Sequence, residues 1–471
     1  MGFLERRKFL NPTNKGLLLG RYRLSEEDSF KNLCLIAPTG AGKTTRFLIN
    51  ALLTINGSAI VTDPSGEIFY KTSAHLKSRG FEVRVLQPAN LSQSLRFNPL
   101  HRCKTQQDLR RIAETLANTT ASSQSDPIWS KAATHILFIV LLALREVAKK
   151  DFSQLHLGNA RLLLNRLGNM EDQAMKTFFS LHLDPIMRGE FEAFTMKDYR
   201  FVSSVIATAT AALDLWSDRD IVTLTASDNV KLEDIREKPT IFYLIAPEHK
   251  IKYFGILLNL FYSSCFEVCL NQPGQPVYFL LEEFGNIGVI NNFESISTTL
   301  RKRKCSISIV LQEKSQLSAI YGREKAQGIF AGGMANKLYL SGLDLETCID
   351  LEKVLGYKTA FNTKTGADED RANTIRKALM SSEDIRMLPE DKAIFISTNR
   401  KPILLKMLPY FSNPVLKQAS DKKPYVLNYD YLQEIVSYLD LKQYGQPWVK
   451  PHKRHNIPTE MINRLGLCTH R

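Results

Sequence analysis

A glycine-rich stretch at residues 37–44 constrains the fold more than any other part of this chain. Its sequence is A-P-T-G-A-G-K-T; a short apolar run, 33–36, precedes it and a helical pattern over 45–54 follows it. A strand, a loop ending in Lys-Thr and a helix are the context of a phosphate-binding P-loop. In such a loop, backbone N–H groups and the positive end of the helix converge on an anion. The sequence therefore predicts a nucleotide site at the end of a strand.

Each residue type in this loop has a predicted role. Gly40 and Gly42 let the backbone curl, Lys43 reaches the β- and γ-phosphates, and the Thr44 hydroxyl binds Mg²⁺. Ala37 occupies the position that is usually the leading glycine of the motif. The predicted cofactors are ATP and Mg²⁺. The residues expected to contact the nucleotide are Pro38, Thr39, Gly40, Ala41, Gly42, Lys43, Thr44 and Thr45.

A P-loop needs a second, acidic element, and the best candidate is the pair Glu282 and Glu283 at the end of the apolar run 277–281. We expect Glu282 on the metal side and Glu283 to polarise the attacking water. We also expect this pair to meet the turn of Lys43 across neighbouring strands. A small-molecule kinase could use the same P-loop, but it would rarely carry this second carboxylate. Asp63, at another predicted strand end, could equally face the nucleotide or cap the next helix.

The predicted fold class is α/β with a mainly parallel central sheet. Short apolar runs that do not alternate are typical of strands buried on both faces, and helical patterns separate several of them. Between 105 and 220 only helical patterns occur, which predicts an inserted all-α domain. The predicted organisation is a discontinuous nucleotide-binding domain (1–104 and 221–430), the insertion (105–220) and a C-terminal helix with a basic tail (431–471). The predicted strands are 33–36, 58–62, 83–86, 241–245, 277–281, 306–311, 337–340 and 393–397.

Composition narrows the class of protein. The chain carries 62 Lys and Arg against 48 Asp and Glu, a net charge of +14, which suggests a polyanionic partner such as nucleic acid or an anionic membrane face. The 7 cysteines form no CxxC pair, as expected for reduced thiols rather than a disulfide framework. We expect no zinc site. The apolar stretches 136–144 and 253–270 are short or interrupted, which predicts buried helices rather than membrane spans.

Several motifs together resemble one family. The segment 62–67, T-D-P-S-G-E, resembles the D-P-K-G-E segment of type IV secretion coupling proteins, the TraG/TraD group of conjugation ATPases. Ser65 replaces the usual Lys, and Glu282 replaces the usual Asp of the acidic motif. Similar matches follow in order over 16–411: G-L-L-L-G at 16–20, N-P-L at 98–100, D-P-I-W with A-A at 126–133, L-E-E-F-G-N-I-G at 281–288, Q-E-K-S-Q-L at 312–317, Y-G at 321–322, L-P at 388–389 and P-Y-F at 409–411.

The resemblance implies a RecA-like P-loop ATPase that works as a homo-hexamer. Such motors couple ATP hydrolysis to the movement of single-stranded DNA, or a DNA–protein complex, toward a secretion channel. By position, Gln312 would sense the γ-phosphate and Arg301 would be the arginine finger given to the neighbouring subunit, with Arg303 the next candidate. The implied partners are relaxosome proteins and channel components, and the implied location is the cytoplasmic, inner face of the cell membrane.

Two alternative functions stay open. The chain could be a substrate-recruitment platform that uses ATP only as an assembly switch, or a DNA pump for segregation or packaging; the D-P-x-G-E, N-P-L and Q-x-x-x-Q-L elements disfavour the pump. Family members usually carry transmembrane helices ahead of the P-loop, and here the residues before Ala37 leave no room for them. We therefore expect a soluble form, either a fragment of a longer protein or a member anchored through a membrane partner.

Overall fold

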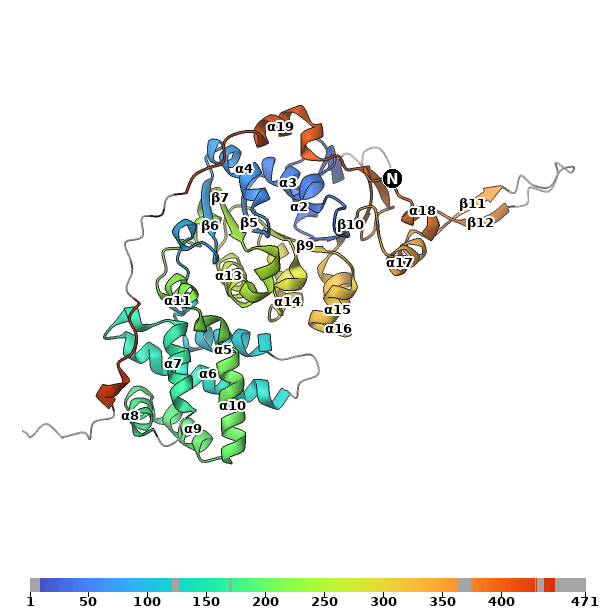
Figure 1. The fold of residues 1–471 in the computed structure, drawn as a ribbon. Helices are drawn as coiled ribbons and strands as arrows, with labels where there is room; N and C mark the ends of the chain where they lie inside the picture. Colours follow the sequence, from blue (N-terminus) through green and yellow to red (C-terminus); the bar gives the residue numbers. More distant parts are fainter. Residues whose placement is uncertain are drawn as a thin grey trace, which may run out of the picture.

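The computed structural model describes residues 9–120, 127–168, 172–361, 374–427, 429 and 436–444 (Figure 1). Its centre is a nine-stranded sheet in the order β14-β13-β10-β4-β9-β8-β5-β7-β6. The seven strands from β10 to β6 are parallel, and β13 and β14 are antiparallel at one edge. Their bounds are β4 (Leu33–Ile36), β5 (Ser58–Asp63), β6 (Glu82–Leu86), β7 (Thr240–Ile245), β8 (Val277–Leu281), β9 (Cys305–Leu311), β10 (Asn336–Tyr339), β13 (Lys392–Ser397) and β14 (Ile403–Lys406).

The α/β class and a strand near each of the eight predicted positions are confirmed. Every residue of β4, β5, β7, β8 and β9 is buried, which explains why these strands are continuous apolar runs rather than alternating ones. β14 was not predicted; it is an edge strand in which only Leu405 is buried. A strand with one buried position carries little hydrophobic signal.

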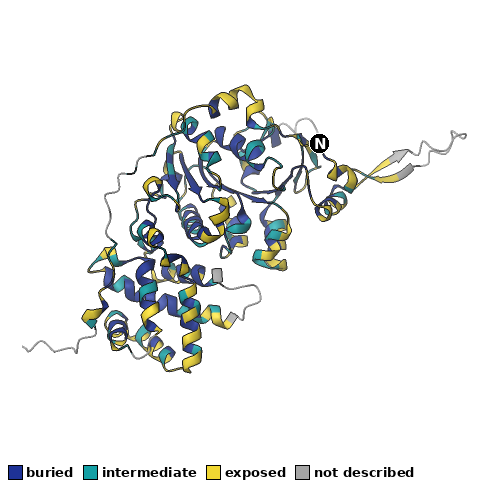
Figure 2. Cartoon of the chain, in the orientation of Figure 1, coloured by how far each residue is buried: buried dark blue, intermediate teal, exposed yellow. Residues whose placement is uncertain are grey.

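Helices cover both faces of the sheet, so that the sheet is buried between two apolar layers (Figure 2). One layer contains α2 (Glu26–Ser29), α3 (Ile49–Leu53), α4 (Glu67–Ser78) and α19 (Pro414–Ser420). The other contains α13 (Ile251–Asn271), α14 (Phe293–Arg301), α15 (Ser315–Tyr321), α16 (Arg323–Gly328) and α17 (Leu345–Leu355). A small sheet of β1 (Leu10–Asn11), β3 (Tyr22–Leu24) and β2 (Leu18–Leu19) precedes β4.

Between β6 and β7 the chain forms a helical bundle beside the layer of α13 (Figure 1). Its central helix is α6, which packs against α5, α7, α8 and α10. The last helix ends at Ala226, so the predicted boundary at 220 falls inside a helix. The bundle consists of α5 (Gln106–Thr120), α6 (Pro127–Ala148), α7 (Leu157–Leu167), α8 (Gln173–His182), α9 (Pro185–Thr195), α10 (Tyr199–Ala211) and α11 (Arg219–Ala226).

Two helices are strongly apolar. The uninterrupted apolar stretches in the sequence were judged too short to cross a membrane, but the helical segments Ile128–Ala148 and Glu248–Asn271 are long and apolar enough by length and composition. Of the most apolar 18-residue stretch in each helix, 56% and 61%, respectively, is buried inside the protein. Core helices of this length satisfy the same criterion, and the packing of α6 and α13 agrees with that role.

Two further segments have structures that the sequence did not predict. β11 (Tyr357–Phe361) pairs with β12 (Thr374–Ala378) in a projecting hairpin, and the connection at 362–373 lies outside the described residues (Figure 1). Of the predicted C-terminal helix, 432–435 and the basic tail after 444 also lie outside them. Residues 436–440 are not helical; Leu439 N–H donates to Asn159 Oδ1 at 3.1 Å and so ties this segment to the helical bundle.

Candidate functional site

The P-loop has the backbone that its glycines predict. Gly40 and Gly42 have φ angles of 83° and 84°, a left-handed conformation that costs little only for glycine. The turn leaves β4 after Ile36 and enters a helical turn at Lys43–Leu48, which continues into α3. Pro38, Thr39 and Ala41 therefore lie in the turn, and Thr44 and Thr45 lie on the first helical turn, where backbone N–H groups lack intrahelical partners.

The paired acids reach this turn, although not from a neighbouring strand as expected. In the sheet order β9 lies between β4 and β8, so two strand spacings separate the P-loop strand from the strand that ends before Glu282. Long side chains bridge the gap. Lys43 Nζ lies 3.0 Å from Glu283 Oε1, and Thr44 Oγ1 donates to Glu282 Oε1 at 2.9 Å. Parallel strands bring their carboxyl ends to one sheet edge, which is why these residues meet.

The intervening strand supplies Gln312. This residue directly follows β9, and its Nε2 lies 3.4 Å from each carboxylate oxygen of Glu283. Its own backbone N–H donates to Gln316 Oε1 at 2.9 Å, which fixes the residue at the strand end. The structure thus brings Lys43, Thr44, Glu282, Glu283 and Gln312 to one edge of the sheet.

The acidic side chains at this sheet edge are buried, which is unfavourable for their charged forms in the folded protein. Glu282 and Glu283 are only 6% and 8% exposed. Burial raises the pKa of Glu282 to about 7; the charges of Asp63 and Glu283 also raise it, while the Thr44 hydrogen bond and the charge of Lys43 oppose the change. A buried carboxyl group of this kind binds a proton near neutral pH unless a cation or a polar ligand compensates its charge.

Asp63 is the residue for which the sequence left two roles open. It is fully buried at the end of β5, beside β8, and its Oδ2 accepts the N–H of Phe69 in the first turn of α4 at 2.7 Å. Its Oδ1 has no hydrogen-bond partner among the described residues. Burial raises the pKa of Asp63 to about 6. The capping contact is therefore present, and the other oxygen remains available next to Glu282.

The backbone at the acidic motif is strained. Glu283 has a φ of 53°, in the left-handed region, where a non-glycine residue costs about 1 kcal/mol or more. The strain turns the chain out of β8 at the point where both carboxylates must face the P-loop. Neither this conformation nor a second contact, in which Arg46 donates to Glu390 beside the P-loop, was readable from the sequence.

Arg301 is the one predicted site residue that the fold keeps away from the others. It ends α14 and is exposed, just before β9 begins at Cys305. Lys43 and Glu283 lie at the other end of this seven-residue strand, about 20 Å away at 3.3 Å per residue. Arg301 therefore cannot reach the P-loop of its own chain, and a role in catalysis requires a second subunit.

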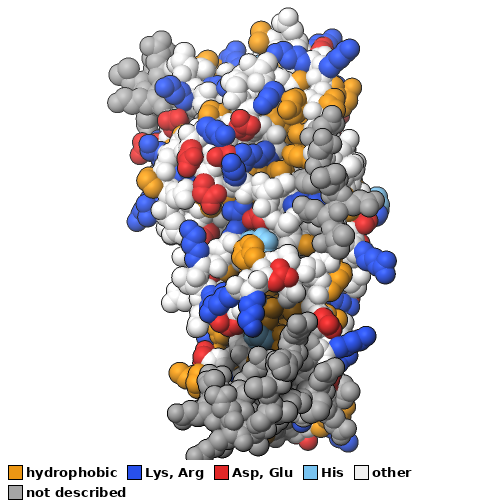
Figure 3. Space-filling view, turned by 90° about the vertical axis from the view of Figure 1, so that its left-hand side faces the viewer, with side chains coloured by type: hydrophobic (Ala, Val, Ile, Leu, Met, Phe, Trp, Pro, Cys, Tyr) orange, Lys and Arg blue, Asp and Glu red, His pale blue; other side chains and the backbone are white. Residues whose placement is uncertain are grey.

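The donor set can hold a magnesium nucleotide. No group of three or more His, Cys, Asp and Glu side chains that could enclose a metal occurs among the described residues. One hydroxyl from Thr44 and one carboxylate from Glu282 instead suit Mg²⁺, which keeps several waters and shares phosphate oxygens. On the face shown in Figure 3, Lys and Arg are interspersed with acids rather than gathered in one patch.

Comparison with known proteins gives consistent matches. Residues 4–433 match the family described as Type IV secretory system Conjugative DNA transfer. Protein VirD4 of Rhizobium radiobacter is 23% identical over 410 residues, covering 83% of this chain and 58% of that protein. The chain thus spans about three-fifths of the length of this relative.

Solved structures match along most of the chain. TrwBdeltaN70, a bacterial conjugative coupling protein in complex with sulphate, has a TM-score of 0.70 at 16% identity, covering 90% of this chain and 95% of that one. The plasmid coupling protein TrwB in complex with ADP and Mg²⁺ has a TM-score of 0.68 at 16% identity, covering 87% and 92%. At this identity the likeness concerns the fold, and it confirms the RecA-like architecture with a helical domain.

Proposed function

The chain belongs to the Type IV secretory system conjugative DNA transfer family, and from this premise we propose that it is an ATP-driven coupling protein. In this role it hydrolyses ATP to recruit single-stranded DNA, or a DNA–protein complex, and to move it to the secretion channel. The observation that carries the proposal is the convergence of Lys43 and Thr44 with Glu282, Glu283 and Gln312 at one sheet edge.

In this proposal each side chain has its own task. Lys43 would bind the β- and γ-phosphates, and Thr44 and Glu282 would hold Mg²⁺, whose positive charge would stabilise the transferring phosphoryl group. Glu283 orients a water molecule and accepts its proton, and Gln312 holds Glu283 in place through the amide contact of 3.4 Å. The structures of TrwB in complex with ADP and Mg²⁺ and with a non-hydrolysable ATP analogue support ATP and Mg²⁺ as ligands here.

Assembly completes the site in this proposal. Arg301 lies at the sheet edge opposite its own P-loop, so we place it as an arginine finger for the ATP of a neighbouring subunit in a homo-hexamer. The partners in this proposal are single-stranded DNA, relaxosome proteins and secretion-channel components, and the location is the cytoplasmic face of the cell membrane. The net charge of +14 supports a polyanionic substrate.

The test is Glu283→Gln, which removes the proton acceptor and keeps the shape of the side chain. We expect hydrolysis to fall by at least about 100-fold, the usual contribution of a general base, while ATP affinity stays near that of the wild type. The matched control is Lys43→Ala, which should lose ATP binding as well. The readouts are phosphate release and titration with a fluorescent ATP analogue. Hydrolysis at the wild-type rate in Glu283→Gln would remove the motor assignment.

The same variant separates the motor from the recruitment platform. In donor cells, a motor that cannot hydrolyse ATP should fail to transfer DNA, whereas a platform that uses ATP only as an assembly switch should still transfer it. We expect transfer to be lost.

A further inference from the structure

The segment that connects the catalytic acids with the helix of Arg301 lies under conformational strain. It runs from Glu283 to Asn292, and both end residues are left-handed non-glycines, with φ angles of 53° and 56°. Such residues persist only where surrounding contacts hold them. The segment leads from the P-loop edge of the sheet to α14, which ends in Arg301.

Part of the support for this segment comes from the nucleotide-binding domain itself. Asn259 Nδ2 on α13 donates to the carbonyl of Val289 at 2.7 Å. The backbone N–H of Ile290 donates to the hydroxyl of Tyr321, at the end of α15, at 3.1 Å. These contacts fix the middle of the segment and leave Asn291, next to the strained Asn292, to be held by another element.

That element is α5, the first helix of the inserted bundle. Asn118 Nδ2 donates to Asn291 Oδ1 at 2.8 Å, and Asn291 Nδ2 donates to Thr115 Oγ1 at 3.4 Å. Thr115 is only 2% exposed, and Asn118 and Asn291 are half-buried, so this pair of hydrogen bonds is partly sheltered from water. The Asn291 side chain thus uses its acceptor and its donor on one face of α5.

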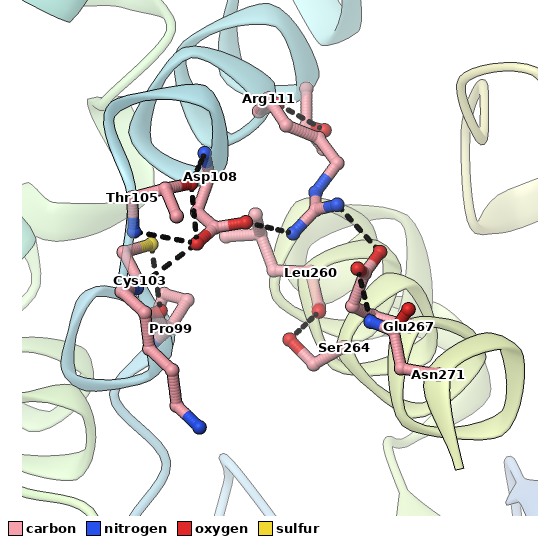
Figure 4. A network of polar contacts seen from close by, with 11 residues as sticks. Pro99, Cys103, Thr105, Asp108, Arg111, Leu260, Ser264, Glu267 and Asn271 are labelled. Carbon is pink, nitrogen blue, oxygen red and sulfur yellow. Dashed lines mark hydrogen bonds and ion pairs between the residues drawn. The ribbon is translucent and has the colours of Figure 1, made fainter.

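The other end of α5 is tied to α13. Arg111 lies between Asp108 of its own helix and Glu267 of α13, with N–O distances of 3.0 Å and 2.5 Å (Figure 4). Asn271 Nδ2 donates to the same Glu267 at 2.7 Å. Helix α5 therefore contacts the nucleotide-binding domain at two places along its length, and the second contact is with the segment from Glu283 to Asn292.

We propose that Thr115 and Asn118 are positioning residues for ATP hydrolysis. Through Asn291 they set the segment that places Glu283 at the ATP site of this chain and Arg301 at the ATP site of the neighbour. A displacement of the helical domain then changes both groups at once. This inference rests on the proposed ATPase activity, because it assigns a task within that reaction.

The experiment is a double-mutant cycle on the full-length chain. Asn118→Ala and Asn291→Ala should each lower kcat about fivefold, the effect of about one lost hydrogen bond, with the ATP dissociation constant unchanged within about twofold. The double variant should be no worse than Asn291→Ala, since the loss of Asn291 already removes the contact with Asn118. Glu114→Ala, an exposed position on the same helix, is the matched control and should keep the wild-type kcat.

A second readout does not depend on turnover. Hydrogen exchange at 283–292 should be faster in Asn118→Ala and in Thr115→Val, but not in Glu114→Ala. If the wild type hydrolyses no ATP, the proposed function fails, and the exchange data still test the contact. If the wild type is active and Asn118→Ala keeps its kcat and its exchange pattern, the inference is wrong. A loss of kcat that is fully additive in the double variant would also overturn it.

Discussion

At the scale of single residues, the site combines acids that the fold alone would not favour. Asp63, Glu282 and Glu283 are all buried, and the charges of Asp63 and Glu283 both act on Glu282, opposed by the charge of Lys43. Burial disfavours the ionised form and raises the pKa of Asp63 and of Glu282. Perturbed carboxyl groups of this kind concentrate at functional sites, because a ligand rather than the fold completes their environment.

Asp63 gives a test of the free energy that burying a carboxyl group costs the folded protein. Its pKa is raised to about 6 by burial, so the folded protein binds its proton more tightly than the unfolded chain, where the pKa is about 3.9. The stability that the protonated form retains at low pH is therefore lost as the pH rises from about 4 through 6. Asp63→Asn stays neutral and can still accept from Phe69, so its stability relative to the wild type should increase by about 2–3 kcal/mol over that interval.

The measurement is the free energy of unfolding from urea titrations at a series of pH values. Asp421→Asn, at an exposed position, is the control and should follow the wild type at every pH. A constant difference between Asp63→Asn and the wild type from pH 4 to pH 7 would contradict the raised pKa.

At the scale of secondary-structure elements, burial decided what could be read from the sequence. Strands buried on both faces were predicted because every position is apolar, as in β8 and β9. The hairpin of β11 and β12 was missed because its described side chains are mostly exposed and Lys358 lies directly opposite Lys377. Like charges opposite each other destabilise a pair of strands, and exposed strands lack an apolar pattern, so the sequence gives no local signal for this hairpin.

The apolar helix α6 provides an element-scale prediction. Leu137 is completely buried at the centre of the bundle. Leu137→Ala should destabilise the bundle by about 2–5 kcal/mol, since it removes buried contacts and leaves a cavity. The fluorescence of Trp216, which is 2% exposed in the same bundle, follows its unfolding in urea.

Leu181→Ala is the matched control, because Leu181 is 56% exposed on α8, and it should change the stability far less. Equal effects of the two substitutions would contradict the assignment of α6 as the core helix of the bundle.

At the scale of the whole molecule, the two ends of the sheet separate functions. The P-loop, the acids and Gln312 occupy the carboxyl edge of the parallel strands, while Arg301 occupies the amino edge. If Arg301 acts in catalysis as we propose, a single chain cannot supply the whole catalytic set. Head-to-tail contacts between identical subunits, which close into rings, would bring one edge to the other.

Mixing inactive variants tests this arrangement. Arg301→Ala and Glu283→Gln should each bind ATP and hydrolyse almost none of it. An equimolar mixture should recover about a quarter of the wild-type rate, because half of the subunits keep Glu283 and half of their ring neighbours keep Arg301. The measurement is phosphate release after co-assembly. No recovery at any mixing ratio would exclude a finger supplied in trans.

The amino-acid sequence by itself determined the P-loop, the strands of the sheet, the helical insertion and the family resemblance. These features depend on local patterns: glycine at left-handed positions, uninterrupted apolar runs and helical periodicity. Tertiary structure alone decided that β9 lies between the P-loop and the acids, that Gln312 contacts Glu283, and that α5 reaches Asn291. Strand order and contacts between distant segments follow from the packing of the whole chain, which no local pattern of residues encodes.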